Sequence, residues 1–388
     1  MEFRFGLHNE IQIPRPWGPR TEYEAFKHTV EQAVLADQVG FEWWSTVEHH
    51  FLCEFSHSSA PEVLYPYVAA RTENVRIGHA VRLLPFPYNH PVRLAEEAAM
   101  LDLLCDGRLE FGIGRSVSWD ELHGFGINPA DTRAMADESL EVILGCWTED
   151  AFSYEGRYFK LPPRHVIPKP LQKPHPPLWM AGTSRDSHEI AGRLGVGCMS
   201  FVLIVPLDEV KARIDMYKAG IAKCTNPAGK FINNRVAGAT AVHVAETDEE
   251  AFANARQWFE WTTKLAIDIV LSVAHQVPAV NPANGAVSVV EAAGGDMGSY
   301  EYLRPFLEFD KNILTLDFLV DNGMVICGSP DTVIEQCKRY MDTGMDTLLT
   351  MHQVGAIPHE KVMRSIQLFG EHVIPAIKKE SAAREAAQ

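Results

Sequence analysis

The sequence alternates short runs rich in β-forming residues with longer helical runs, and this alternation repeats eight times. The expected strands lie at 3–8, 40–47, 75–84, 108–114, 176–182, 195–201, 235–245 and 346–353. Helices are expected at about 21–39, 60–72, 91–105 and 130–147, and others begin near 184, 206, 248 and 329. This order predicts a parallel sheet covered by helices. Eight such units in 388 residues favour a closed (β/α)8 TIM barrel over an open sheet.

Two segments depart from the alternation. Residues 152–162 predict a small surface hairpin that turns at Glu155–Gly156. Residues 276–305 are rich in Gly, Ala, Pro and Asn and show no period, which predicts a mobile insertion after the seventh strand, at the active-site end. A loosely structured surface excursion is the alternative. We therefore expect one barrel domain over 1–380 with this insertion, followed by a C-terminal tail, 381–388, that is the frayed end of a helix.

Charge and cysteine content exclude several classes of protein. The formal net charge of −16 argues against nucleic acid or an anionic membrane as a partner, because both require clustered Lys and Arg. No apolar run is long enough for a transmembrane helix, and the first residues lack the pattern of a secretory signal. The seven Cys residues are scattered and never spaced as CxxC, so we expect free thiols in the cytoplasm and no metal framework.

Polar residues gather where the expected strands end. In such barrels the active site lies at the carboxyl ends of the strands. The segment STVEHHFLCEFS, residues 45–56, places two adjacent histidines, His49 and His50, at the end of the second strand. Successive side chains of a strand point to opposite faces, so at most one of these imidazoles faces the same pocket unless the backbone leaves strand geometry there.

The ends of the fourth and fifth strands predict a phosphate site. Arg115 follows glycines that allow close approach of the backbone to a ligand. Thr183 and Ser184 begin a helix, where free N–H groups and the helix dipole favour an anion. The alternative is that Ser184 only caps the helix and Arg115 only forms a surface ion pair. The GIGR run is not a dinucleotide fingerprint, because Val117 occupies the place of the third glycine.

Four segments together resemble a known family. They are GFEWWSTVEHHF, RIGHAVRLLPFPYNHPVRLAEEAAMLDLLCDGRLEFGIGRS, PPLWMAGTSRDSHEIAGRLG, and the closing GSPDTVIEQCKRYMDTGMDTLL with GAIPHEKVMRSIQLFGEHVIP. In this order they resemble the bacterial luciferase-like flavin monooxygenases over nearly the whole chain. The resemblance implies a barrel that binds FMN, as reduced FMNH2, supplied by a separate NAD(P)H:flavin reductase. Addition of O2 would give a 4a-peroxyflavin that oxygenates a small organic substrate. The family also suggests a homodimer.

The resemblance assigns roles to individual residues. His49 corresponds to the family's catalytic histidine, which would shuttle a proton beside the flavin, whereas His50 would point away and Glu48 could orient either ring. The residues implied at the cofactor are Arg115, Ser184, Ser187 and the backbone of Val117 at the phosphate, Thr183 at the isoalloxazine, and a cis peptide at Ala80–Val81 under the ring.

The chain also departs from the luciferases. Gly114 stands where they have a reactive cysteine, which is expected to open space beside the flavin and argues against light emission. The substrate pocket is expected to include His8, His79, Gly114, Trp119 and His123. Trp179 either faces this pocket or belongs to the core.

Three other functions fit parts of the pattern. Related barrels bind a deazaflavin and transfer hydride without O2, and a non-catalytic partner subunit would keep the barrel but lose the flavin site. A metal-dependent hydrolase could use His8, His49 and His50, although barrel hydrolases commonly use an HxH pair, whose two rings share a face. The substrate itself is not specified by the sequence.

Overall fold

The computed structural model describes residues 2–116, 118–276, 278–281, 285–288 and 310–386. Its centre is a parallel sheet in the order β10-β14-β1-β2-β3-β5-β8-β9, which closes because β9 also pairs with β10. The predicted (β/α)8 barrel is therefore confirmed. The barrel strands are β1 (Arg4–Asn9), β2 (Trp43–Thr46), β3 (Arg76–His79) with its continuation β4 (Arg82–Leu83), β5 (Leu109–Gly114), β8 (Leu178–Gly182), β9 (Gly197–Phe201), β10 (Val236–Val244) and β14 (Thr347–Met351).

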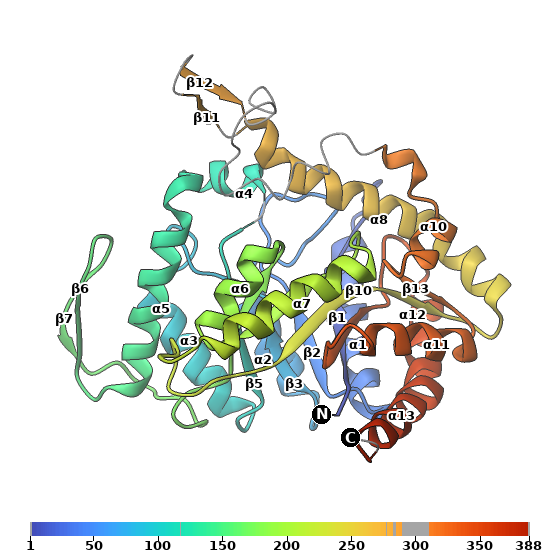
Figure 1. The fold of residues 1–388 in the computed structure, drawn as a ribbon, viewed down its shortest axis with the longest axis horizontal. Coiled ribbons are helices and arrows are strands. Elements are labelled where there is room, and N and C mark those ends of the chain that lie inside the picture. Colours follow the sequence, from blue (N-terminus) through green and yellow to red (C-terminus); the bar gives the residue numbers. More distant parts are fainter. Residues whose placement is uncertain (1, 117, 277, 282–284, 289–309, 387–388) are drawn as a thin grey trace.

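Helices surround the barrel on the outside (Figure 1). Their apolar faces pack on the outward side chains of the strands, and this layer forms the main hydrophobic core. Every helix predicted from the sequence is present. The helices are α1 (Thr21–Gln38), α2 (Pro61–Ala69), α3 (Pro91–Leu104), α5 (Thr132–Thr148), α6 (Arg185–Arg193), α7 (Leu207–Ala222), α8 (Asp248–Gln276) and α11 (Pro330–Met341).

A smaller apolar cluster fills the barrel interior. Trp43 and Trp179 pack with ring centroids 5.0 Å apart, and Met199 and Leu349 lie against them. The indole N–H of Trp179 donates to Glu110 Oε2 at 2.6 Å, so the buried ring has a partner for its polar atom. Trp179 therefore belongs to the core, and the interior is plugged below the carboxyl ends of the strands.

Helix α8 covers the open end of the barrel. It runs across the end opposite the two chain termini, with β11 (Pro278–Asn281) and β12 (Gly285–Ser288) beyond it (Figure 1). Ala266, Ile269 and Val270 follow helical spacing and turn one apolar face of α8 toward the strand ends. This helix therefore forms a roof over the region where the sequence predicts the site.

The inserted segment differs in part from its prediction. Residue 276 still belongs to α8, and β11 and β12 form an antiparallel pair where an aperiodic loop was expected. Short paired strands at Gly-rich turns lack the length needed for a visible period. The rest of the expected insertion, at 277, 282–284 and 289–305, lies outside the described residues.

Other elements were not predicted at all. They are α4 (Trp119–Gly124), α10 (Leu316–Asp321), β13 (Ile326–Gly328) and α12 (His359–Leu368). The helix expected to end in the tail is α13 (Ile374–Ala386). The expected tail begins at 381, but α13 continues through that position. Ser381 is buried and its Oγ accepts a hydrogen bond from the Phe3 N–H at 3.1 Å. The predicted hairpin is confirmed as β6 (Phe152–Glu155) paired with β7 (Lys160–Arg164).

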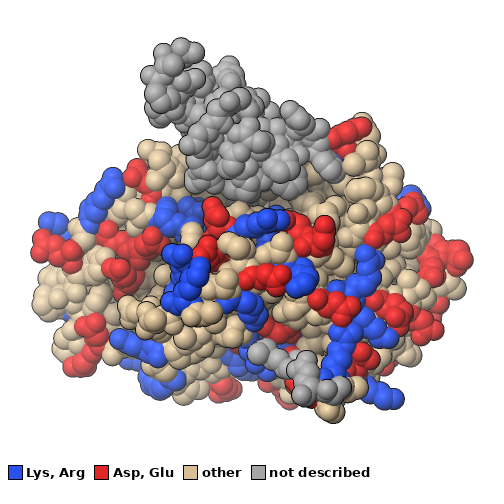
Figure 2. All heavy atoms as spheres, viewed as in Figure 1, with Lys and Arg blue, Asp and Glu red and all other residues tan. Residues whose placement is uncertain are grey.

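The surface carries both signs of charge. On the face drawn in Figure 2, Lys and Arg are interspersed with Asp and Glu. Within the described residues, none of the helices combines the length and the apolar character that crossing a membrane requires.

Candidate active site

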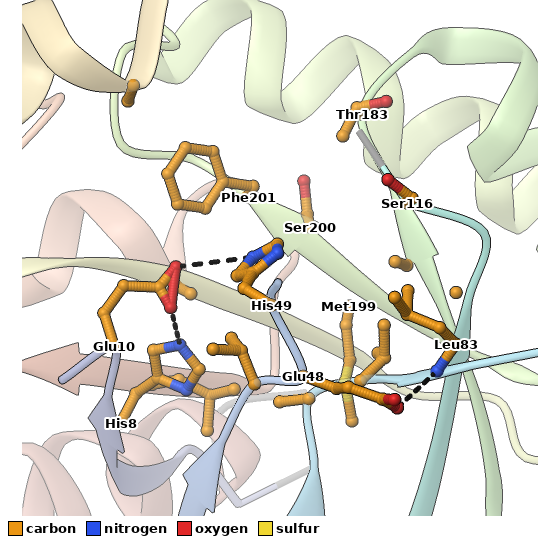
Figure 3. A pocket seen from close by; sticks show the side chains of 18 of the residues that line it. His8, Glu10, Glu48, His49, Leu83, Ser116, Thr183, Met199, Ser200 and Phe201 are labelled. Atoms are coloured by element: carbon orange, nitrogen blue, oxygen red, sulfur yellow. Dashed lines mark hydrogen bonds and ion pairs between the residues drawn. The ribbon is translucent and has the colours of Figure 1, made fainter. Parts of the chain in front are cut away.

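A cavity lies at the carboxyl ends of the barrel strands, beneath α8 (Figure 3). Its polar groups come mainly from the ends of β1, β2, β5 and β8. Apolar side chains make up most of the remaining wall, among them Val47, Phe55, Val81, Leu83, Met199, Phe201, Ile269 and Val270. A mostly apolar chamber with a few convergent polar groups is typical of sites that bind small organic molecules.

A second pocket opens from the same rim and is more polar. The two pockets share Gly114, Arg115, Ser116, Ala181 and Thr183, so they are continuous. The second one lies between α5 and α6. Its charged and hydroxyl-bearing side chains are Arg115, Ser116, Arg133, Asp137, Thr183, Ser184, Asp186 and Ser187. Together the pockets suit a ligand with a flat apolar part and a polar tail.

Backbone hydrogen bonds position His49 beyond the end of β2. The N–H of Glu48 donates to the Val81 carbonyl at 3.2 Å, and the N–H of His49 donates to the Ser58 carbonyl at 3.0 Å. The chain has left the β-ladder here, so the two imidazoles are not bound to the alternation of a strand. The ring of His49 enters the cavity, with 14% of its side chain exposed.

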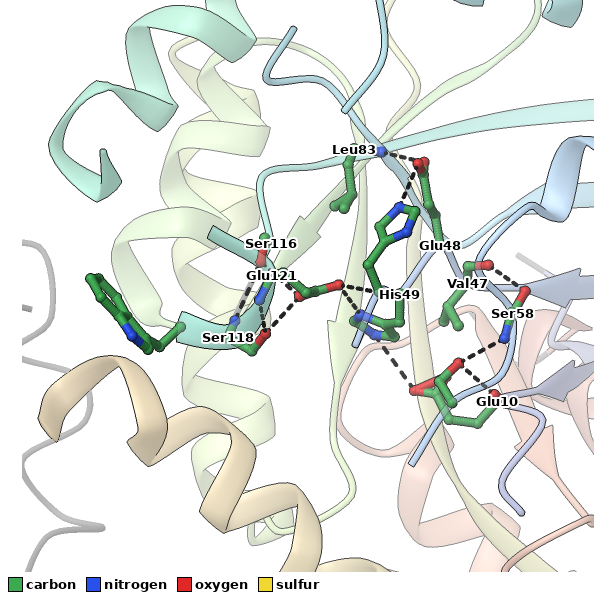
Figure 4. Close-up of polar contacts among 12 residues, drawn as sticks. Glu10, Val47, Glu48, His49, Ser58, Leu83, Ser116, Ser118 and Glu121 are labelled. Atoms are coloured by element: carbon green, nitrogen blue, oxygen red, sulfur yellow. Dashed lines mark hydrogen bonds and ion pairs between the residues drawn. The ribbon is translucent and has the colours of Figure 1, made fainter. Parts of the chain in front are cut away.

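Glu121 of α4 holds the His49 ring (Figure 4). His49 Nδ1 lies 2.9 Å from Glu121 Oε1, and a carboxylate can only accept, so Nδ1 is the donor. Glu121 also accepts from the His50 backbone N–H at 3.0 Å and from the hydroxyls of Ser116 and Ser118 at 2.7 and 3.0 Å. Four donors thus hold this buried carboxylate in place. Because Nδ1 of His49 is bound to it, Nε2 is the ring nitrogen that faces the cavity.

These contacts shift the pKa values of both partners. Burial alone disfavours the imidazolium, but the charge and hydrogen bond of Glu121, with the charges of Glu10 and Glu48, raise the pKa of His49 to about 9. Burial opposes ionisation of Glu121 as well, yet His49 and the hydroxyl donors lower the pKa of that carboxyl to about 2. At neutral pH the pair is an imidazolium and a carboxylate.

Glu10 and His8 bring further titratable groups to the cavity (Figure 3). Glu10 Oε1 lies 3.9 Å from His49 Nε2, and Glu10 Oε2 lies 4.0 Å from His8 Nε2. Burial raises the pKa of Glu10 to about 7, although the charge of His49 acts in the opposite direction. Burial and the nearby His49 lower the pKa of His8 to about 4, so His8 is neutral at pH 7.

His50 points away from the cavity. Its Nε2 lies 3.2 Å from Glu48 Oε1, its ring stacks on Tyr88, and Phe125 packs against its edge. Glu48 therefore orients His50, and Glu121 orients His49. The same Glu48 carboxylate accepts from the Leu83 N–H at 3.0 Å, which ties this loop to the end of the third strand.

The expected phosphate residues meet in the second pocket. Ser184 and Ser187 form a capping box at the start of α6: Ser184 Oγ accepts from the Ser187 N–H at 3.2 Å, and Ser187 Oγ accepts from the Ser184 N–H at 3.0 Å. Arg115 Nη1 donates to Thr132 Oγ1 at 3.1 Å. The serines thus cap the helix and also line the pocket, so the two interpretations of Ser184 are compatible.

A cis peptide joins Ala80 and Val81 at the cavity wall, as the resemblance implied. Gly114 faces the same place, but it does not open space there. A Cβ added at Gly114 would lie 2.3 Å from Val81 Cγ2, so the missing side chain accommodates Val81. The expectation of free space beside a flavin at Gly114 is therefore corrected.

Three predicted pocket residues lie elsewhere. His79 is fully buried between Tyr65 and Phe111, outside both pockets, and burial holds its pKa well below the usual value. Trp119 and His123 stack on each other along α4 and line neither pocket. Val117 lies outside the described residues.

The structure also adds residues that the sequence did not reveal. Glu121 was hidden because α4 was not predicted, although Ser118 three residues earlier is a capping signal. Glu10 follows the first strand directly and its position alone could have suggested it. Arg133 lies one helical turn from Asp137 on α5, and nothing in its local pattern marks a site.

Comparison with known proteins gives consistent matches. The family model for luciferase-like monooxygenases matches residues 10–347. The oxygenase component of a flavin-dependent trigonelline monooxygenase from Acinetobacter baylyi is 28% identical over 222 residues, which cover 57% of this chain and 60% of that protein. An FMNH2-dependent dimethylsulfone monooxygenase from Pseudomonas putida is 23% identical over 360 residues, which cover 92% and 89%.

A solved structure extends this likeness to the fold. The monooxygenase RslO1 from Streptomyces bottropensis superposes with a TM-score of 0.74 at 26% identity, covering 96% of this chain and 99% of that one. The match therefore extends over nearly the whole of both chains.

Proposed function

The chain belongs to the luciferase-like monooxygenase family, and from that premise we propose that it is the oxygenase of a two-component system. It would take reduced FMN from a separate NAD(P)H-dependent flavin reductase and use O2 to oxygenate a small organic substrate. The observation that carries the proposal is the continuity of an apolar chamber containing His49 with a polar pocket containing Arg115 and the start of α6.

The residues present fit FMN. The chamber beside Ala80–Val81 is apolar enough for the isoalloxazine, with Thr183 at the junction of the two pockets. Arg115 and Arg133 supply positive charge for the phosphate, and Ser184 and Ser187 supply hydroxyls at a helix N-terminus. Asp137 and Asp186 share this pocket, so the cations also balance two carboxylates. The FMNH2-dependent relative from P. putida supports the same assignment.

His49 would act as an acid. Reduced flavin, when bound, supplies the electrons that activate O2. The imidazolium of His49 presents Nε2 to the chamber while Glu121 fixes Nδ1, so a proton is available at a defined atom. The α8 helix and the apolar wall would limit the access of water to the chamber. This would strengthen the electrostatic interactions of the His49 imidazolium and limit side reactions.

A single-turnover experiment tests this role. Protein with bound FMNH2 is mixed with O2 in a stopped-flow instrument, and flavin reoxidation and release of hydrogen peroxide are followed. We expect the protein to change both time courses relative to free FMNH2. We expect His49→Asn to alter them and the exposed His165→Asn to leave them unchanged. Time courses equal to those of free FMNH2 would refute the proposal, and binding of a deazaflavin in place of FMN would support a hydride transferase.

The remaining expectations follow the same proposal. The protein would work in the cytoplasm beside its reductase, and the family suggests a homodimer. Size-exclusion chromatography with light scattering measures the oligomeric state, and a monomeric mass would contradict the proposed homodimer.

A further inference from the structure

Glu10 carries a buried carboxylate at the wall of the chamber. The residue is 4% exposed, and Oε2 has no hydrogen-bond partner among the described residues. The imidazole of His8 places its Nε2 4.0 Å from this oxygen, beyond hydrogen-bond distance. A buried polar atom without a partner is costly, so a ligand that brings a hydrogen-bond donor to this oxygen would be favoured.

The backbone holds Glu10 in place. Its carbonyl accepts from Ser56 Oγ at 2.8 Å, and the next residue, Ile11, has a φ of +56° although its side chain is β-branched and buried. A β-branched residue in the left-handed region is rare, and such conformations cluster at functional sites. The chain thus turns sharply just after Glu10, whose carboxylate faces the cavity (Figure 3).

Barrel topology places Glu10 across the cavity from the proposed phosphate pocket. Glu10 follows β1, and Thr183 follows β8, which is four strands away in either direction around the closed sheet. Apolar side chains such as Val47, Phe55 and Ala266 line the same cavity, and the imidazoles of His8 and His49 flank the Glu10 carboxylate. A ligand seated here would be mostly apolar, and the carboxylate of Glu10 offers it a hydrogen-bond acceptor.

We propose that Glu10 is a specificity-determining residue that binds an O–H or N–H donor on an otherwise apolar substrate. The substrate class is therefore small alcohols, phenols and amines, and while Glu10 is ionised, compounds with a carboxylate at that position are rejected by repulsion and by the unpaired acceptor. This inference rests on the proposed function, because it concerns the substrate side of the same chamber.

Binding of four probes with one common ring tests the proposal. They are cyclohexylmethanol, cyclohexylmethylamine, methylcyclohexane and cyclohexanecarboxylate. They are titrated calorimetrically at pH 8, above the Glu10 pKa of about 7, into the flavin-free protein and again with FMN present. We expect the alcohol and the amine to bind at least about tenfold more tightly than the other two, as a hydrogen bond to a charged group predicts. Glu10→Leu should abolish this preference, and Glu10→Gln, which keeps an acceptor oxygen, should reduce it.

Controls separate this inference from the proposed function. Glu155→Gln on the exposed β6–β7 turn should leave the probe ranking unchanged. Unchanged melting temperatures and FMN affinity show that the Glu10 variants are folded. A wild type that binds neither donor, that prefers the carboxylate, or whose ranking survives in Glu10→Leu overturns the inference. Failure of wild-type protein to bind FMN would instead overturn the proposed function.

Discussion

One carboxylate, Glu121, sets the protonation state of the central histidine. The pKa of His49 is about 9, above its ordinary value, so the imidazolium persists through neutral pH and is lost as the pH rises through about 9. A reaction that needs this proton should therefore be constant at neutral pH and decline on the alkaline side.

Glu121→Gln should move that decline to lower pH. Removing the nearest negative charge leaves burial, which lowers the pKa of His49, as the dominant effect. The measurement is the pH profile of product yield or of single-turnover flavin reoxidation. Asp120→Asn, an exposed neighbour on the same helix, should keep the wild-type profile. An alkaline limb that stays in place in Glu121→Gln would contradict the assigned pairing.

The close contact between Gly114 and Val81 can be tested by substitution. In Gly114→Ala the new Cβ would meet Val81 Cγ2 at 2.3 Å, so we expect a loss of about 1–3 kcal/mol in the free energy of unfolding. Urea denaturation measures this loss. Val81→Ala in the same chain should restore most of the stability, whereas Gly18→Ala, where only an ordinary contact is met, should cost little. Absence of rescue would show that another contact is responsible.

At the scale of elements, a buried cluster holds the end of the third strand. Arg82 on β4 is 1% exposed and lies 3.0 Å from Glu48, 2.9 Å from Glu62 and 3.0 Å from Glu97. Burial raises the pKa of Glu97 to about 7 even though Arg82 opposes the shift. One guanidinium thus stabilises the carboxylates that connect β4, α2, α3 and the loop that carries His49.

Arg82→Met should be strongly destabilising, by about 3–5 kcal/mol, because it leaves the buried carboxylate of Glu48 without its cation. The exposed pair Arg93–Glu96 gives the matched control: Arg93→Met should cost at most about 1 kcal/mol. Both values come from chemical denaturation at neutral pH. Equal costs for the two substitutions would mean that the cluster does not stabilise the strand end.

The sequence predicted the regular elements well and the short ones poorly. Each barrel strand and its helix carry a clear period, so their positions were predicted within a few residues. Six-residue helices such as α4 and α10 are too short for a period, and their positions depend on tertiary packing. The missing α4 explains why Glu121 was not found, while residues next to strand ends, such as His49 and Arg115, were correctly brought to one rim.

The local sequence pattern also did not predict which way a strand side chain points, into the cavity or outward into the core. His79 belongs to a barrel strand as expected, but its ring turns outward against Tyr65. Alternation identifies two faces of a strand without stating which one meets the cavity when both are buried. For the same reason Trp179 could not be assigned between pocket and core until the packing against Trp43 was seen.

At the scale of the whole molecule, the barrel brings residues as far apart in the chain as His8 and Leu349 to one roofed chamber. The strand ends supply the imidazolium of His49, the carboxylate of Glu10 and the polar pocket around Arg115. Helix α8 covers the chamber in which they meet. The family shares this scaffold while the chemistry depends on the site, so the central claim concerns what the chamber binds.

The most direct test is an equilibrium titration that compares FMN with riboflavin, which has the same ring and lacks the phosphate. We predict that FMN binds at least about tenfold more tightly than riboflavin. Arg115→Ala should remove that difference without changing riboflavin affinity, and the exposed Arg164→Ala should keep it. If neither reduced nor oxidised FMN binds the wild-type protein, or if the phosphate contributes nothing, the account is wrong.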